Sequence, residues 1–74
     1  MNGKRFKQIR ENLGLSQEQL AHMLGFSSKQ AVSNIETGFR NPSNLVTAVM
    51  LILKELPKKR SLELQTLLFE FCKQ

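Results

Sequence analysis

Three glycines, at positions 14, 25 and 38, divide the first half of the chain into short segments. Each glycine closes a segment whose apolar residues recur at helical spacing, and a Ser or Asn able to cap the next helix follows within a few residues. Glycine readily adopts the left-handed backbone that ends helices, and Ser and Asn are favoured where helices begin. The pattern therefore predicts a series of short helices joined by tight turns.

The first two segments have the apolar spacing of amphipathic helices. Residues 4–13 carry Phe6, Ile9 and Leu13 on one side. The second segment opens with Ser16, which can form a capping box with Gln19, and it ends at Gly25. Its inward residues are predicted to be Leu20, Ala21 and Leu24.

The third segment runs to Thr37 and is unusually polar, because only Ala31, Val32 and Ile35 are apolar. Ser27 would begin it with a capping box to Gln30, whereas Ser28 would begin it one residue later. The sequence leaves both starts open. In either case the helix buries a narrow stripe and exposes most of its circumference.

Two longer helices are predicted in the second half of the chain. Ser43 can cap a helix over 44–56 that is apolar almost all round, which is typical of a central core helix and too short for a bilayer span. Pro57 cannot continue it, residues 58–60 form a basic connection, and Ser61 starts a fifth helix from Leu62 to about Lys73. We therefore expect one all-α domain of five helices over residues 1–74.

The charge of the chain is unevenly distributed. Residues 1–60 hold ten Lys or Arg and four Glu, a net charge of +6, whereas residues 61–74 hold one Lys and two Glu, a net charge of −1. A basic body favours a polyanion as its partner, and the apolar tail favours a protein partner. Ordinary solubility is the alternative explanation of the charge.

The composition offers little for chemistry. The chain has no Asp, one His at position 22 and one Cys at position 72, so we expect no metal site, no cofactor and no catalytic group. His22 is interpreted as a surface residue. A single Cys suits the reducing cytosol, and Met1–Arg10 lacks the apolar stretch of an export signal. These features predict a cytoplasmic protein that does not associate with membranes.

Several motifs carry a resemblance to a known family. They are Gly14-Leu15-Ser16-Gln17-Glu18-Gln19-Leu20-Ala21, Leu24-Gly25, Val32-Ser33-Asn34-Ile35-Glu36-Thr37-Gly38 and Arg40-Asn41-Pro42-Ser43. Over residues 4–56 the sequence resembles the helix-turn-helix domain of lambdoid phage repressors and Cro proteins, the xenobiotic-response-element family. One departure is that Gly25-Phe26-Ser27-Ser28 has one residue more in the turn than the usual pattern, which affects the register before Val32.

The resemblance implies a lambda-repressor-like fold that binds double-stranded DNA. Alignment backwards from Val32 places four residues at base-reading positions: Lys29, Gln30, Ser33 and Asn34. Gln and Asn can pair with adenine, and Lys can donate to guanine. Residues at phosphate-contacting positions are Gln17, Ser28, Phe39, Arg40, Asn41 and Ser43. The alternative for the base-reading set is an ordinary solvated helix surface.

Arg10 and Glu36 interrupt otherwise apolar faces. In the family the matching positions form a partly buried ion pair that links the first helix to the end of the recognition helix. The resemblance therefore implies a structural role for this pair, since the guanidinium fork can meet a carboxylate with two hydrogen bonds.

The last helix, within residues 61–74, is predicted to be a dimer interface. Leu64, Leu67, Leu68, Phe71 and Cys72 form one expected stripe, and Leu62 and Phe69 form another. One stripe can cover the domain's own core and the other a second subunit, although the helix could also be absorbed by its own domain. A homodimer would read a short, imperfectly palindromic site whose half-sites lie about 34 Å apart.

These expectations favour a dimeric transcriptional regulator, a repressor or autorepressor of a phage or mobile-element promoter. The alternatives are an antitoxin whose last helix binds a toxin, and a controller of a restriction-modification or anti-CRISPR operon. An enzyme is not expected.

Overall fold

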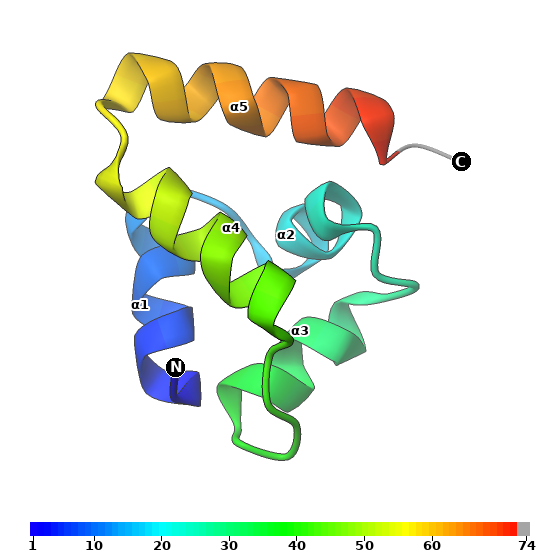
Figure 1. Ribbon diagram of the computed structural model, residues 1–74. Coiled ribbons are helices and arrows are strands. Elements are labelled where there is room, and N and C mark those ends of the chain that lie inside the picture. The colour runs from blue at the N-terminus through cyan, green and yellow to red at the C-terminus, as the bar shows by residue number, and fades with distance from the viewer. Residues whose placement is uncertain (73–74) are drawn as a thin grey trace.

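The computed structural model describes residues 1–72, and this part of the chain is all-helical. The helices are α1 (Gly3–Asn12), α2 (Gln17–Leu24), α3 (Lys29–Glu36), α4 (Asn44–Glu55) and α5 (Lys58–Phe71). Figure 1 shows α5 lying across one end of the molecule, over α2 and α4, with α3 at the opposite end. The predicted all-α class is confirmed. Within the described residues, none of the helices has the length and apolar character needed to cross a membrane.

The helix ends follow the predicted punctuation. Ser16 accepts a hydrogen bond from the Gln19 N–H, and the Gln19 side chain accepts one from the Ser16 N–H, which confirms the capping box. The Ser43 hydroxyl likewise caps α4 by accepting from the N–H of Val46. Both caps satisfy backbone donors that would otherwise have no partner in the first turn.

The turn between α2 and α3 begins with a Schellman motif. Gly25 has φ of +74°, the Phe26 N–H donates to the Ala21 carbonyl at 2.8 Å, and the Gly25 N–H donates to the His22 carbonyl at 3.2 Å. Phe26 is half-buried against the core. The longer turn thus runs from Gly25 to Ser28, and α3 begins after Ser28 rather than after Ser27.

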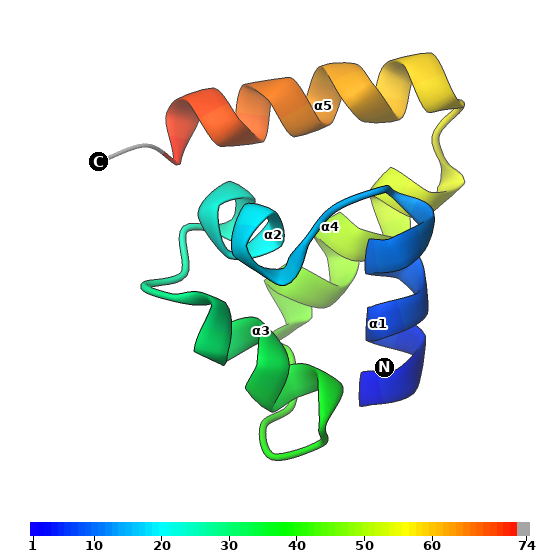
Figure 2. The same cartoon turned by 180° about the vertical axis from the view of Figure 1, so that it is seen from behind.

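One buried apolar cluster joins α1 to α4. Its members are Phe6, Ile9, Leu20, Ala21, Met23, Val32, Ile35, Met50 and Leu53. The predicted inward residues of the first three segments lie in this cluster or half-buried against it, apart from Ala31, which is half-buried on α3. Figure 2 shows α1, α2 and α3 on the side of the molecule that faces away from the viewer in Figure 1.

The helix predicted as a central core helix, over 44–56, is buried on one side only. Only Met50 and Leu53 of α4 are buried, whereas Leu45, Leu51 and Ile52 are exposed. Figure 1 shows why: α1, α2 and α3 lie behind α4, α5 crosses its carboxyl end, and no element of the described chain covers its outer face. The apolar residues of α4 therefore exceed what this small domain can cover.

The start of the fifth helix also differs from the expectation. Pro57 is the N-cap of α5, so Lys58, Lys59 and Arg60 form the first helical turn rather than a connection. Proline is tolerated at a helix start because the N–H that it lacks would have no partner there. The predicted end at Lys73 lies outside the described residues.

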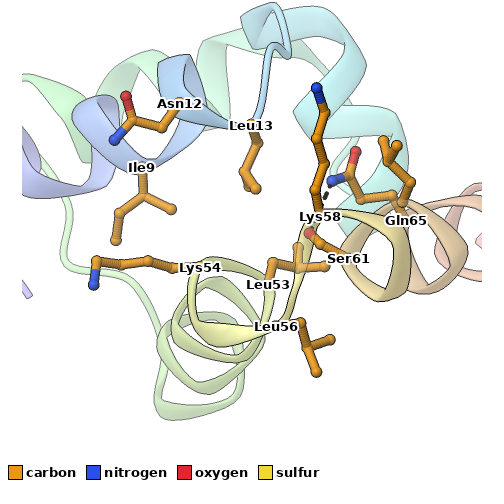
Figure 3. A pocket seen from close by; sticks show the side chains of 10 residues that line it. Ile9, Asn12, Leu13, Leu53, Lys54, Leu56, Lys58, Ser61 and Gln65 are labelled. Atoms are coloured by element: carbon orange, nitrogen blue, oxygen red, sulfur yellow. Dashed lines mark hydrogen bonds between the residues drawn. The ribbon is translucent and has the colours of Figure 1, made fainter.

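Ser61 does not start the helix but is buried inside it, where its hydroxyl accepts a hydrogen bond from the Gln65 side chain at 3.2 Å. Figure 3 shows this pair in the groove between α1, α4 and α5, beside Leu13 and Leu53. Two buried polar groups are thus paired with each other, so their burial costs less than it would for unpaired groups.

The predicted single stripe on the fifth helix is divided in the structure. Leu64 and Leu68 pack half-buried against the domain's own core, and the Cys72 sulfur lies beside Gly25 at the end of α2. Leu67 and Phe71 are exposed on the outside. Leu64, Leu68 and Cys72 therefore belong to the inward side of α5, together with Phe69.

Gly3 brings the start of α1 against the end of α3. A Cβ atom at this position would overlap with the Glu36 carbonyl oxygen and lie 2.5 Å from that of Ile35. Both neighbours are backbone atoms, which cannot turn aside as a side chain can. The missing side chain therefore sets the distance between the two helices.

We predict that Gly3→Ala destabilises the fold by about 1–3 kcal/mol, because overpacking must displace backbone. Alanine in an exposed helix would by itself be stabilising relative to glycine. A loss of stability would therefore come from the close contact with α3. Thermal denaturation followed by circular dichroism measures it. Gln8→Ala, at an exposed position of the same helix, is the control and should be close to neutral. A Gly3→Ala protein at least as stable as the wild type would contradict the close contact.

Candidate nucleic-acid interface

Helix α3 presents a polar face that the rest of the domain leaves uncovered. Val32 and Ile35 are buried, and these two side chains anchor the helix. Of the four predicted base-reading residues, Lys29 and Gln30 are exposed and Ser33 and Asn34 are half-buried. A polar helix face of this kind, held at the edge of a domain, can enter the major groove of DNA.

Gln30 and Asn34 lie one helical turn apart and are bonded to each other. The Gln30 amide nitrogen donates to the Asn34 side-chain oxygen at 2.9 Å. The bond uses one donor of Gln30 and one acceptor site of Asn34, so the Gln30 carbonyl and the Asn34 amide hydrogens remain for a base edge. The two side chains therefore act as one oriented unit.

The first turn of α3 carries no side-chain cap. Ser28 occupies the N-cap with an extended backbone, but its hydroxyl caps no backbone N–H, and the capping box considered for Ser27 and Gln30 does not form. The amides at the start of this helix are consequently not occupied by a cap. Uncapped amides at a helix N-terminus are suited to a phosphate oxygen.

A buried polar network holds the recognition helix in place. Arg10 Nε donates to Glu36 Oε2 at 2.6 Å, and Arg10 Nη2 donates to Glu36 Oε1 at 3.3 Å. Arg10 Nη1 donates to the Leu15 carbonyl at 2.8 Å. The structure thus contains the ion pair that the family resemblance implied, with side chains only 10% and 4% exposed. Arg10 also fixes the connection between α1 and α2.

Gln17 belongs to the same network, which the sequence analysis did not anticipate. Its side-chain amide donates to Glu36 Oε1 at 2.9 Å, so this side chain is committed to the interior rather than extended towards solvent. Gln17 is nevertheless the first residue of α2, and its backbone N–H lies at a helix N-terminus. The only sequence signal for the internal bond was that Gln17 stands at the start of a helix near the predicted ion pair.

The loop after α3 brings together most of the predicted phosphate-contacting residues. Phe39, Arg40 and Asn41 are exposed, and the Arg40 N–H donates to the Asn34 carbonyl at 3.0 Å, which ties the loop to α3. Asn34, Arg40, Asn41 and Ser43 line one shallow pocket. Ser43 differs from the others because its hydroxyl already caps α4.

The structure therefore divides the ten predicted DNA contacts into two groups. Eight lie on α3, its N-cap or the loop that follows it, with side chains that are not committed to the interior: Ser28, Lys29, Gln30, Ser33, Asn34, Phe39, Arg40 and Asn41. The side chains of Gln17 and Ser43 make internal bonds. His22, predicted on the surface, is exposed, and its ring lies 5.5 Å from that of Phe69 on α5.

We predict that Arg10→Ala destabilises the protein by about 3–5 kcal/mol, because it leaves the buried Glu36 carboxylate without its cation. Urea denaturation measures the loss. Arg10→Met combined with Glu36→Leu should recover much of it, since removing both charges avoids stranding either one. An Arg10→Ala protein with an unchanged unfolding midpoint would mean that the pair contributes nothing to stability.

The comparisons with known proteins agree with this geometry. The family model described as Helix-turn-helix matches residues 6–46, which is more than half of the 74 residues and covers most of α1, all of α2 and α3, and the start of α4. No curated protein and no solved structure gives a significant match. With its uncovered α3 and the turn that precedes it, the chain belongs to the helix-turn-helix family of sequence-specific DNA-binding transcription regulators.

Proposed function

We propose that this protein is a repressor that binds a short, imperfectly palindromic operator as a homodimer. The observation that carries the proposal is the polar face of α3, held to α1 and α2 by the Arg10–Glu36–Gln17 network. A network that fixes the orientation of α3 favours sequence recognition, because base contacts require a fixed helix orientation. One α3 reads only a few base pairs, and two related by a two-fold axis read two half-sites.

The base contacts are assigned to Lys29, Gln30, Ser33 and Asn34. Lys29 and Gln30 lie at the exposed start of α3, where a recognition helix enters the major groove. The Gln30–Asn34 pair is suited to adenine, which offers one acceptor and one donor to an amide, and Lys29 is suited to guanine.

The phosphate contacts are assigned to the two ends of α3. Ser28 and the uncapped amides lie at one end, and Phe39, Arg40 and Asn41 lie at the other. Gln17 and Ser43 are proposed to contribute through backbone rather than side-chain groups, because their side chains are used internally and each lies at a helix N-terminus. Such contacts set the register of the protein on DNA.

Repression needs only occupancy of a promoter, so the proposed function requires no catalysis, cofactor or metal. The resemblance to phage repressors favours a phage or mobile-element promoter, including the protein's own. A DNA-binding role, in turn, supports a cytoplasmic location.

The alternative functions are an antitoxin, or the controller of a restriction-modification or anti-CRISPR operon. The exposed apolar residues of α4 and α5 favour the antitoxin among these, because a toxin could cover them. Co-purification of a second protein encoded beside this one would support it.

We predict that Gln30→Ala and Asn34→Ala each cost roughly 1–3 kcal/mol on the preferred site and relax the preference at one base pair per half-site. Because the two side chains are bonded, the double variant should lose less than the sum of the single losses. Arg40→Ala is the matched comparison and should weaken binding to all sequences alike. Fluorescence anisotropy on cognate and scrambled duplexes measures these effects. Equal losses on both duplexes for all three variants would contradict the assigned roles.

We also predict that selection from random duplexes recovers a symmetric site and that its binding is strongly salt-dependent. The net charge of +6 on residues 1–60 motivates this expectation. Log K should fall with log salt at about 0.9 per neutralised phosphate. Titrations between low and physiological salt give the slope. Recovery of no preferred sequence would overturn the proposed repressor.

A further inference from the structure

A groove lies where α1, α4 and α5 meet, at the end of the molecule away from α3 (Figure 1). This α1–α4–α5 groove has a volume of about 370 Å³. Binding sites for small molecules measure about 300–1,000 Å³, so the groove has the size of the smaller ones. Its volume therefore favours a small molecule over a segment of another protein.

Aliphatic side chains make up the apolar part of the groove. Figure 3 shows Ile9 and Leu13 of α1 and Leu53 of α4 around one space. Leu62 of α5 also lines the groove and is 48% exposed. An aliphatic chain laid against these residues would remove apolar surface of both partners from water, which is favourable.

Two lysines give the groove a positive charge. Lys54 stands in the last turn of α4, Lys58 is the first residue of α5, and both are exposed. Lys54 Nζ lies 3.5 Å from Glu55 Oε2, but the Glu55 side chain is 73% exposed, so this contact neutralises little. Among the described residues that line the groove, none is acidic. The charge of the groove is therefore suited to an anionic ligand.

The start of α5 adds to this positive charge. Its first turn holds Lys58, Lys59 and Arg60 and no acidic residue, and its N-cap, Pro57, supplies no side-chain cap. The N-terminal end of a helix carries a partial positive charge of its own, so cations are disfavoured there. An anion bound beside Lys58 would offset this repulsion.

A buried polar pair lies in the same groove. Ser61 and Gln65 are only 4% and 6% exposed, and the Gln65 amide donates to the Ser61 hydroxyl at 3.2 Å. The Ser61 hydroxyl keeps its own hydrogen for a second bond. Ser61 follows Lys58 by three residues on α5, so the two lie on the same side of the helix. One anionic group can therefore meet both a hydroxyl donor and an ammonium group.

We propose that the α1–α4–α5 groove binds a small carboxylic acid with an aliphatic chain. Lys58 and the Ser61 hydroxyl hold the carboxylate, and Lys54 adds attraction. The chain lies against the aliphatic residues of α1, α4 and α5. Such a ligand connects three helices and stabilises the fold. The site goes beyond the proposed function and does not depend on it, since α3 lies at the opposite end of the molecule.

Titration of the full chain with octanoate tests the site. Calorimetry measures the affinity, and methyl NMR locates the ligand. We expect saturable binding of one octanoate per chain, with shift changes at the methyl groups of Leu13, Leu53 and Leu62 and a raised melting temperature. Octanol, which has the same chain without the charge, and acetate, which has the charge without the chain, should each bind at least about tenfold more weakly.

Single substitutions check which residues hold the acid. Lys58→Gln should weaken octanoate binding about fivefold. Lys59→Gln is the matched control, because Lys59 lies in the same helical turn but does not line the groove. Leu62→Gln should also weaken binding, since it places an amide on the apolar surface. All three positions are exposed, and circular dichroism confirms that the variants fold.

Four outcomes would overturn the site. The first two are no saturable binding by the wild type, and octanol bound as tightly as octanoate. The third is a set of shift changes centred on Leu45 and Ile52, which are exposed on α4 outside the groove and would indicate a general affinity of apolar surface for the chain. The fourth is an equal loss for Lys58→Gln and Lys59→Gln. Because these measurements use no DNA, the groove and the proposed repressor can each fail without the other.

Discussion

The buried ion pair between Arg10 and Glu36 is the interaction on which the placement of the recognition helix depends. It joins α1 to the last turn of α3, and through the Leu15 carbonyl and Gln17 it also holds the connection to α2 and its first turn. A carboxylate this deeply buried is costly unless its charge is matched and its oxygens accept hydrogen bonds. Here both conditions are met by three donors from two other helices.

The pair matters because hydrophobic contacts alone would hold α3 weakly. Only Val32 and Ile35 of this helix are buried, and a wider apolar stripe would remove polar residues from its exposed face. A two-residue anchor leaves rotation about the helix axis poorly determined. The directional hydrogen bonds of Glu36, and the close approach of Gly3 to the same turn, supply the missing restraint. The stability of the domain and the orientation of the polar side chains of α3 therefore depend on the same contacts.

Exposed apolar surface is the second constraint on the molecule. A domain of this size buries only about 60% of the surface of its unfolded chain, so it cannot enclose all the apolar residues of α4 and α5. Helix α4 buries Met50 and Leu53 and leaves Leu45 and Ile52 outside. The same small size that allows α3 to stand uncovered also leaves α4 and α5 uncovered. The polar face of α3 and the exposed apolar residues of α4 and α5 thus lie on different sides of one small core.

The sequence by itself determined the helices and their caps, because these depend on neighbours within a few residues. Gly25 ends α2, and Ser16 and Ser43 start helices through bonds to the third residue after them. The resemblance likewise located the Arg10–Glu36 pair and the reading helix, since the motif fixes their spacing. Local rules failed at Ser61 and at residues 58–60, where a proline that can end one helix was also able to begin the next.

Only the tertiary structure decided which side each apolar residue faces. Helical spacing placed Leu68 and Phe71 on one stripe, yet the crossing of α5 over α2 and α4 turns Leu68 inward and leaves Phe71 in solvent. The hydrogen bond from Gln17 to Glu36 and the contact of Gly3 with α3 could not be predicted from the sequence either. In both cases the partner is 19 residues or more away in the chain. Contacts between residues so far apart in the chain depend on how the helices pack, and the periodicity within one helix does not encode that packing.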